Sequence, residues 1–166
     1  MALRTISSIK GNYLLEKSAT FTPQNDLIHI LIADDHAAVR EGLTAVLKFR
    51  CNMDVIAEAA DGSEALAQYR RHRPDITLMD MSMPKMNGLE ATSAILSEFP
   101  GARIILLTAF DGVEVKARAA GAKAVILKEA SYDELSKIIR EVHDTAVLEK
   151  ANDRKPVTAA AIAVPA

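Results

Sequence analysis

The chain has 166 residues, of which 49% are hydrophobic and 25% are charged, and its formal net charge at pH 7 is −2. This balance indicates one soluble globular domain with tails and gives no broad attraction to nucleic acid or to membranes. Cys51 is the single cysteine, which excludes an internal disulfide, and the lack of a membrane-length apolar run or a secretory leader indicates a cytoplasmic protein.

Five strand and helix pairs are predicted in chain order. Residues 1–26 show no sustained period and end in the turn-rich sequence FTPQND, so we expect a flexible leader there. Apolar runs bounded by turn residues predict strands at 27–33, 53–60, 75–80, 103–109 and 123–128. Amphipathic segments predict a first helix that buries Val39, Leu43, Val46 and Leu47, and later helices at 61–72, 87–99, 111–122 and 131–142. The domain should end at 148, and the charged, then alanine-rich residues 149–166 are expected to form a flexible tail or linker stub.

Three of the helix starts carry capping sequences, in which Asp, Asn or Ser is followed three residues later by Glu. These pairs are Asp61 with Glu64, Asn87 with Glu90, and Ser131 with Glu134. Strands that alternate with helices predict a parallel sheet covered by helices on both faces.

Three carboxylates follow the apolar runs of two predicted strands. Asp34 and Asp35 come directly after the first strand, and Asp80 closes the third. If these strands are parallel neighbours, their carboxyl ends meet at the edge where open α/β sheets bind ligands. Crowded like charges need a cation or a proton, and carboxylate oxygens are ligands that Mg²⁺ prefers. The sequence therefore predicts a magnesium site at this edge.

Asp80 is the candidate nucleophile, because a carboxylate beside a metal ion can attack phosphorus and form an aspartyl phosphate. Alternatively, Asp80 caps the turn into MSMPKMNG by accepting backbone N–H bonds. Asp35 has a similar alternative as the N-cap of the first helix. Capping needs only one carboxylate, so two adjacent acids with a third on a neighbouring strand favour the metal site.

Thr108 and Lys128 close the fourth and fifth predicted strands. The Thr108 hydroxyl is placed to donate to a phosphoryl oxygen on Asp80, or else to bond the backbone of the next turn. The Lys128 ammonium is placed to contact the same oxygens as a point charge, or else to remain a solvated surface group. Because polar residues suited to phosphate close four strands at one edge, the joint pattern favours a phosphoryl site.

Residues 27–148 resemble the receiver domain of two-component response regulators. The resemblance rests on the segments ILIADDHAAVREGL, DITLMDMSMPKMNGLEA, IILLTAF and AGAKAVILKEAS, which occur in the order typical of the family. The sequences of these segments are most similar to those of receivers that precede a LuxR-type helix-turn-helix DNA-binding domain. The implied fold is a flavodoxin-like, doubly wound (βα)5 with a five-stranded parallel sheet of order 2-1-3-4-5.

The resemblance also implies the roles of individual residues. Asp80 would be the phosphoacceptor, and Asp35, Asp80 and the backbone carbonyl of Ser82 would bind Mg²⁺, with Asp34 helping through water. Thr108 would be the switch hydroxyl and Lys128 the contact to the phosphoryl group. The donor would be a histidine kinase or a phosphotransfer protein. The domain would act as a signalling phosphoacceptor and not as an enzyme, through protein contacts with a downstream effector.

Three positions depart from the family pattern. Val125 stands where an aromatic residue usually partners the threonine, Glu129 stands where proline often follows the lysine, and the stretch from Thr108 to Gly121 is shorter than usual. The shortening falls in the fourth helix, on the usual output face, and together with Val125 it makes a non-switching interaction module an alternative. A phosphohydrolase is a further alternative, but Ser82 occupies the position of its usual second acid.

Nothing after Leu148 predicts a helix-turn-helix, so we expect either a stand-alone receiver or a fragment of a longer regulator. We expect no direct contact of this chain with nucleic acid or a membrane, and a monomer or weak homodimer.

Overall fold

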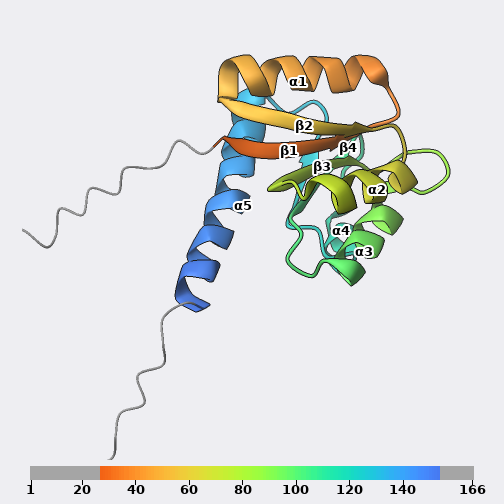
Figure 1. Cartoon of the computed structure of the whole chain (residues 1–166). Coiled ribbons are helices and arrows are strands. Elements are labelled where there is room, and N and C mark those ends of the chain that lie inside the picture. The colour runs from red at the N-terminus through yellow and green to blue at the C-terminus, as the bar shows by residue number, and fades with distance from the viewer. Residues whose placement is uncertain (1–26, 154–166) are drawn as a thin grey trace, which may run out of the picture.

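Five parallel strands form the centre of the molecule, and the computed structural model describes residues 27–153 of the chain (Figure 1). The strands are β1 (Ile28–Ala33), β2 (Met53–Ala59), β3 (Ile76–Asp80), β4 (Ile104–Thr108) and β5 (Ala124–Leu127). All neighbours in the sheet run parallel, in the order β2-β1-β3-β4-β5. The expected fold class and strand order are therefore confirmed. The leader predicted at 1–26 lies outside the described residues.

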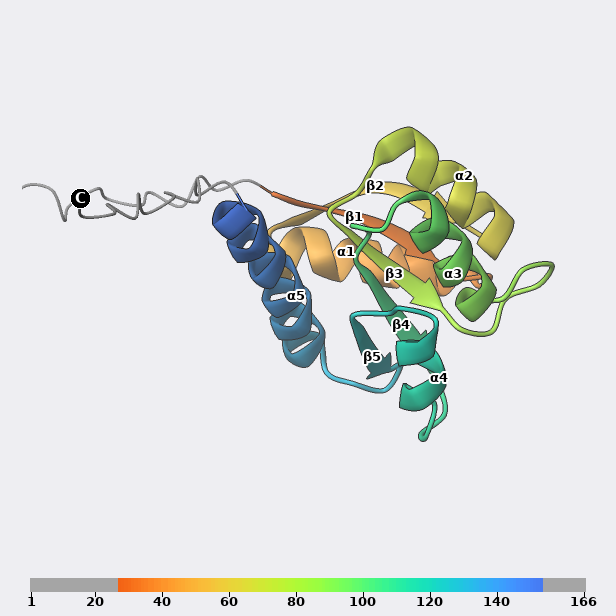
Figure 2. The same ribbon diagram turned by 90° about the horizontal axis from the view of Figure 1, so that it is seen from below.

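Helices cover both faces of this sheet, as the alternation of strands and helices predicted. The helices are α1 (Ala37–Cys51), α2 (Gly62–His72), α3 (Gly88–Glu98), α4 (Glu114–Ala119) and α5 (Tyr132–Asp153). Figure 2 shows α1 and α5 on one face, with α2, α3 and α4 on the other. No helix within residues 27–153 is both long and apolar enough to cross a membrane.

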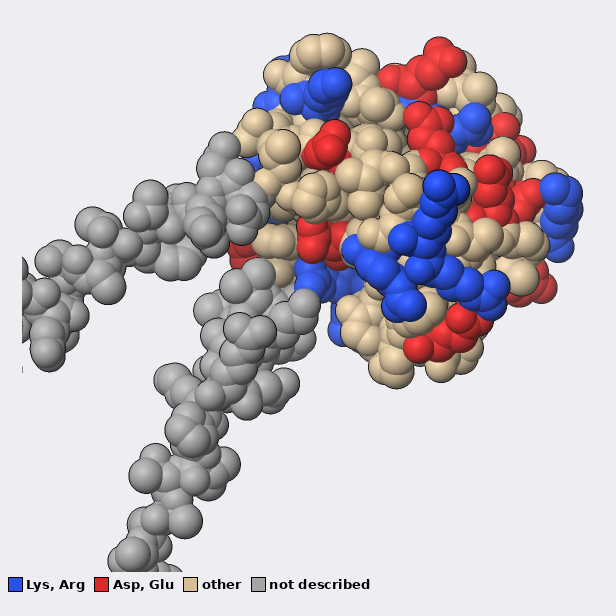
Figure 3. All heavy atoms as spheres, viewed as in Figure 1, with Lys and Arg blue, Asp and Glu red and all other residues tan. Residues whose placement is uncertain are grey.

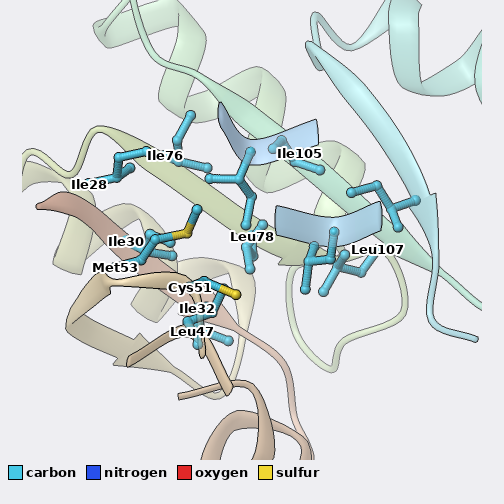
Figure 4. Close-up of a cluster of buried hydrophobic side chains, with 13 residues drawn as sticks. Ile28, Ile30, Ile32, Leu47, Cys51, Met53, Ile76, Leu78, Ile105 and Leu107 are labelled. Carbon is cyan, nitrogen blue, oxygen red and sulfur yellow. The ribbon is translucent and has the colours of Figure 1, made fainter. Parts of the chain in front are cut away.

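Strand side chains alternate between two hydrophobic layers because successive residues of a strand point to opposite faces. In β1, Ile30 and Ile32 face α1 and α5, whereas Leu31 and Ala33 face α2 and α3. Figure 4 shows the first of these layers, in which Leu47 of α1 packs among the strand isoleucines. Burial of each Ile or Leu side chain stabilises the folded state by about 1.5–3 kcal/mol. The two layers therefore hold the sheet, and with it the strand ends that carry the site, in place.

The predicted helix caps form as expected. The Asp61 side chain accepts the N–H of Glu64 at 2.8 Å, and Asn87 with Glu90 makes a reciprocal capping box. At α5 the Ser131 hydroxyl accepts the N–H of Glu134 at 3.2 Å.

Two helices differ in length from the others in ways that matter for the output face. Helix α4 has only six residues, in line with the short stretch noted in the sequence. Helix α5 continues to Asp153, beyond the predicted end at 142, because no proline or glycine interrupts it before Pro156. The tail expected from 149 onward is thus helical through Asp153, and the remainder lies outside the described residues.

Candidate functional site

Three charged side chains from separate strand ends meet at the carboxyl edge of the sheet. Asp34 follows β1, Asp80 ends β3 and Lys128 follows β5. The Nζ atom of Lys128 lies 2.8 Å from Oδ2 of Asp34 and 3.0 Å from Oδ2 of Asp80. Asp34 is fully buried and Asp80 is 2% exposed. The structure thus brings together two predicted acids and the predicted lysine, and Lys128 is no freely solvated surface group.

Burial and the neighbouring charges shift the pKa values of this cluster in opposite directions. Burial raises the pKa of Asp80, although hydrogen bonds from Lys128 and from the Ser82 backbone lower it, and the charge of Asp34 raises it further. Burial favours the neutral form of Lys128, but its hydrogen bonds to Asp34 and Asp80 outweigh this and raise its pKa. Two carboxylates thus share one ammonium, which leaves a residual negative charge that attracts a further cation.

Asp35 lies at the outer side of the cluster, next to His36. The side chain of Asp35 is 32% exposed, and its Oδ1 atom lies 2.8 Å from Nδ1 of His36. The N-cap of α1 is His36 and not Asp35, and the cap position makes no side-chain hydrogen bond. Asp34 instead accepts the backbone N–H of His36 at 2.9 Å. The capping role considered for Asp35 is therefore not the arrangement in the structure.

The acidic residues suit a hard divalent cation. Within residues 27–153, Asp34, Asp35 and His36 are the residues whose ligand atoms lie close enough together to share a metal ion, and Asp80 lies outside this group. Asp80 is tied to the group through Lys128, which contacts both Asp34 and Asp80. Carboxylate oxygens on a buried, under-neutralised edge are the donor type that Mg²⁺ prefers, so the residues fit this ion.

The chain turns sharply after Asp80, and this turn sets the position of Ser82. The Ser82 backbone N–H donates to Oδ1 of Asp80 at 3.2 Å. The N–H of Gly88 donates to the carbonyl of Met81 at 3.0 Å, and a Cβ atom at Gly88 would lie 2.1 Å from the carbonyl oxygen of Asp80. Only glycine therefore fits where α3 begins beside the candidate nucleophile.

Thr108 ends β4, and its hydroxyl is bonded to the backbone of the following turn. Its Oγ1 atom accepts the N–H of Phe110 at 3.0 Å and donates to the carbonyl of Phe110 at 3.2 Å. The structure thus shows the second of the two arrangements considered for this residue, in which it bonds the next turn. To donate to a phosphoryl group on Asp80, the hydroxyl must give up its donation to the Phe110 carbonyl.

Supporting contacts made by two basic residues, Arg40 and Lys85, were not predicted. Nη1 of Arg40 donates to the carbonyl of Asp34 at 2.7 Å, and Nε donates to Glu58 at 2.8 Å. Lys85, in the loop between β3 and α3, pairs with Asp61 at 2.5 Å, and this contact lowers the pKa of Asp61. The sequence marked Asp61 only as a helix cap, and no motif signalled its second partner across the fold.

Comparison with known proteins agrees with this geometry. The response regulator receiver domain family matches residues 30–140. The oxygen regulatory protein NreC of Staphylococcus haemolyticus is 44% identical over 117 residues, covering 69% of this chain and 54% of that protein. The chain thus spans about half the length of the curated relatives it matches.

Two solved structures share the fold. A two-component response regulator of the LuxR family from Aurantimonas sp. SI85-9A1 is 34% identical, with a TM-score of 0.68, and the match covers 77% of this chain and 98% of that one. The CheX–CheY–BeF3–Mg complex from Borrelia burgdorferi contains a chain that is 29% identical, with a TM-score of 0.65, covering 69% of this chain and 88% of that one. The chain belongs to the response regulator receiver domain family of two-component signalling and is similar to the receivers of LuxR-family regulators.

Proposed function

We propose that Asp80 accepts a phosphoryl group from the phosphohistidine of a histidine kinase or phosphotransfer protein. The observation that carries this proposal is the Lys128 ammonium held between the buried carboxylates of Asp34 and Asp80. A carboxylate oxygen of Asp80 attacks phosphorus, the new P–O bond forms as the P–N bond to the donor histidine breaks, and the acyl phosphate remains on β3.

The surrounding side chains favour this transfer in two ways. Burial raises the pKa of Asp80, and the hydrogen bond from Lys128 opposes this rise, which favours the ionised nucleophile. The same ammonium lies 3.0 Å from Oδ2 of Asp80. Once the acyl phosphate has formed there, the ammonium can pair with a phosphoryl oxygen and neutralise its charge. Asp35, Asp80 and the carbonyl of Ser82 would hold Mg²⁺, with Asp34 acting through water. When bound, this ion supplies positive charge to the phosphoryl oxygens.

Phosphorylation then alters the loop after β4. The Thr108 hydroxyl turns toward the phosphoryl group and gives up both hydrogen bonds to Phe110. The change reaches a downstream effector protein through the face of α4, β5 and α5. On this face α4 has only six residues, and Val125 is a small side chain where the family usually has an aromatic one. We further propose that the domain works in the cytoplasm, as a monomer or weak homodimer, and turns over no external substrate.

The test is labelling with radioactive acetyl phosphate and Mg²⁺. Wild-type protein should acquire an alkali-labile label, whereas Asp80→Asn should acquire none, because an amide cannot form the acyl phosphate. Asp144→Asn on the exposed side of α5 is the matched control and should label like the wild type. Equal labelling of the Asp80 variant and the wild type would remove the proposal.

A further inference from the structure

Two arginines and a tyrosine line one hollow at the edge of the sheet opposite Asp80. Arg73 caps the end of α2 and Arg103 directly precedes β4, and both border a hollow of about 450 Å³ together with Tyr69 and Phe99. Figure 3 shows Lys and Arg side chains gathered over α2 on this face of the molecule. The phosphoacceptor edge lies at the other end of β3 and β4, so this is a separate location.

The Arg103 side chain is largely covered, but it forms no ion pair within residues 27–153. The residue is 8% exposed, and Nη1 makes a single long hydrogen bond, 3.3 Å, to the carbonyl of Asp75. Arg73 donates from Nε to the carbonyl of Arg70 at 3.1 Å. Neither arginine forms an ion pair with any residue between 27 and 153. Both guanidinium groups therefore keep N–H donors available at the hollow that they border, where an anion can accept them.

The two acids that border the hollow, Asp75 and Glu98, have their described partners on other residues. Asp75 accepts the backbone N–H of His29 at 3.0 Å, and its carboxylate lies 3.3 Å from the His29 ring. Both oxygens of Glu98 accept hydrogen bonds from Arg70. Both contacts of Asp75 use Oδ2, and neither Asp75 nor Glu98 forms an ion pair with Arg73 or Arg103 within residues 27–153.

Tyr69 adds a third donor. The residue is 7% exposed, and its hydroxyl forms no hydrogen bond within the described part of the chain. Burial raises the pKa of Tyr69, while the nearby charges of Arg73 and Arg103 lower it and Asp75 raises it, so the phenol stays neutral and keeps its proton. The ring of Phe99 already stacks on Tyr69 and lies 3.6 Å from the Arg73 guanidinium carbon, so it offers little surface for a base.

We propose that this hollow binds a phosphate-type oxyanion through Arg73, Arg103 and the Tyr69 hydroxyl. Guanidinium groups recognise such anions through paired N–H donors, and a phenol supplies one more. Lys123 borders an adjoining hollow of about 300 Å³ that also reaches Arg103, and its charge adds to the attraction. The lack of a free aromatic face indicates recognition of the anionic group itself and not of a nucleobase.

The proposal is tested by thermal unfolding of the full chain in inorganic phosphate, at constant ionic strength and with EDTA to exclude divalent ions. A ligand that binds only the folded state raises the melting temperature, here by an expected value of about 3–5 °C at a phosphate concentration about five times the dissociation constant. Arg103→Met should abolish the rise, and Tyr69→Phe, which keeps the stacked ring, should weaken it. Arg71→Gln, which does not line the hollow, is the matched control and should keep the full rise.

Parallel titrations distinguish phosphate bound in this hollow from phosphate bound at the phosphoacceptor edge. Asp80→Asn should respond to phosphate like the wild type, because the phosphoacceptor edge is not involved. Nuclear magnetic resonance should place the phosphate-dependent shifts at Arg73 and Arg103 side chains, and succinate in place of phosphate tests whether carboxylates compete. The proposal would be overturned if phosphate did not raise the melting temperature of the wild type, or if it raised that of Arg103→Met and Tyr69→Phe as much as that of the wild type. If Arg103→Met fails to fold, the Tyr69→Phe comparison alone decides it.

Discussion

The ammonium nitrogen of Lys128 lies 2.8 Å from Oδ2 of Asp34, a residue 94 positions earlier in the chain. Asp34 is fully buried, whereas the Lys128 side chain remains 28% exposed. The contact joins the end of β5 to the end of β1, although β3 and β4 lie between them in the sheet. A carboxylate removed from water in this way depends on a cation, so Lys128 is a structural counter-ion before any phosphoryl group arrives.

The first prediction is that Lys128→Met destabilises the domain at pH 7 without divalent ions. Removing one partner of a fully buried ion pair costs about 3–5 kcal/mol, and the partial exposure of Lys128 should reduce this to about 2 kcal/mol. Urea unfolding measures the loss, and added Mg²⁺ should recover part of it by replacing the lost charge.

Lys137→Met is the control for this variant. Lys137 is exposed and lies 3.9 Å from Glu141 on the same helix, so its loss should change stability by less than about 0.5 kcal/mol. Equal losses in the two variants would mean that Lys128 is not the counter-ion of the acids.

The second prediction concerns pH. Burial gives Asp80 a higher pKa in the folded chain than in the unfolded one, where the ordinary value is 3.8. The folded state then binds the proton more tightly, so the contribution of Asp80 to stability falls as pH rises through the interval between the two values. Asp80→Asn should therefore be more stable than wild type at pH 7 without divalent ions, and this advantage should vanish below about pH 3.8. Urea unfolding from about pH 3 to about pH 8 checks it, and an advantage that grows toward acid pH would contradict it.

Much of the fold could be predicted because burial and chain direction leave clear patterns. Strands β3 and β4 are buried at every position, and a polar residue marks the end of each. The order of the strands does not follow from periodicity, because all five are similar apolar runs, and only the family resemblance implies it. The extension of α5 is not predicted, because a charged segment is typical of a flexible tail, although Glu and Lys favour helix nearly as well as alanine does.

The site could be predicted only as far as strand ends determine it. Asp34, Asp80 and Lys128 meet because parallel strands bring their carboxyl ends to one edge. The hydroxyl of Thr108 depends on its rotamer and on the following turn, and the sequence left both of its arrangements open. The sequence did not mark Arg103 as a site residue. What sets it apart is that it forms no ion pair within residues 27–153, and this depends on the tertiary structure.

The third prediction compares two glycines. A Cβ atom at Gly88 would lie 2.1 Å from the carbonyl oxygen of Asp80, so Gly88→Ala must displace the turn after β3 and should cost about 1–3 kcal/mol or more. A Cβ atom at Gly42 in α1 meets nothing within 4 Å, so Gly42→Ala should stabilise the chain by about 0.5–1 kcal/mol. Chemical unfolding of both variants checks the contrast. A neutral Gly88→Ala would show that the turn can move freely, which would undermine its role in setting Ser82 beside the nucleophile.

The fourth prediction concerns the two hydrogen bonds between the Thr108 hydroxyl and the Phe110 backbone, here called the latch. Thr108→Val keeps the shape of the side chain but removes both hydrogen bonds to the Phe110 backbone, so it should cost about 1 kcal/mol and speed amide exchange at Phe110. Beryllium fluoride with Mg²⁺, a mimic of the phosphoryl group, should speed the same exchange in wild type by drawing the hydroxyl away. In Thr108→Val it should have no further effect at Phe110, because the latch is already open.

Thr145→Val is the matched control for the latch, because its hydroxyl bonds only the Glu141 carbonyl within α5, at 2.8 Å. This variant should leave Phe110 exchange unchanged and should keep the full response to beryllium fluoride. Hydrogen exchange at Phe110 that is equally fast in wild type and in Thr108→Val, without the mimic, would show that the two hydrogen bonds do not restrain the loop. The path from Asp80 to the output face would then have to begin at Lys128, whose stem leads directly into β5.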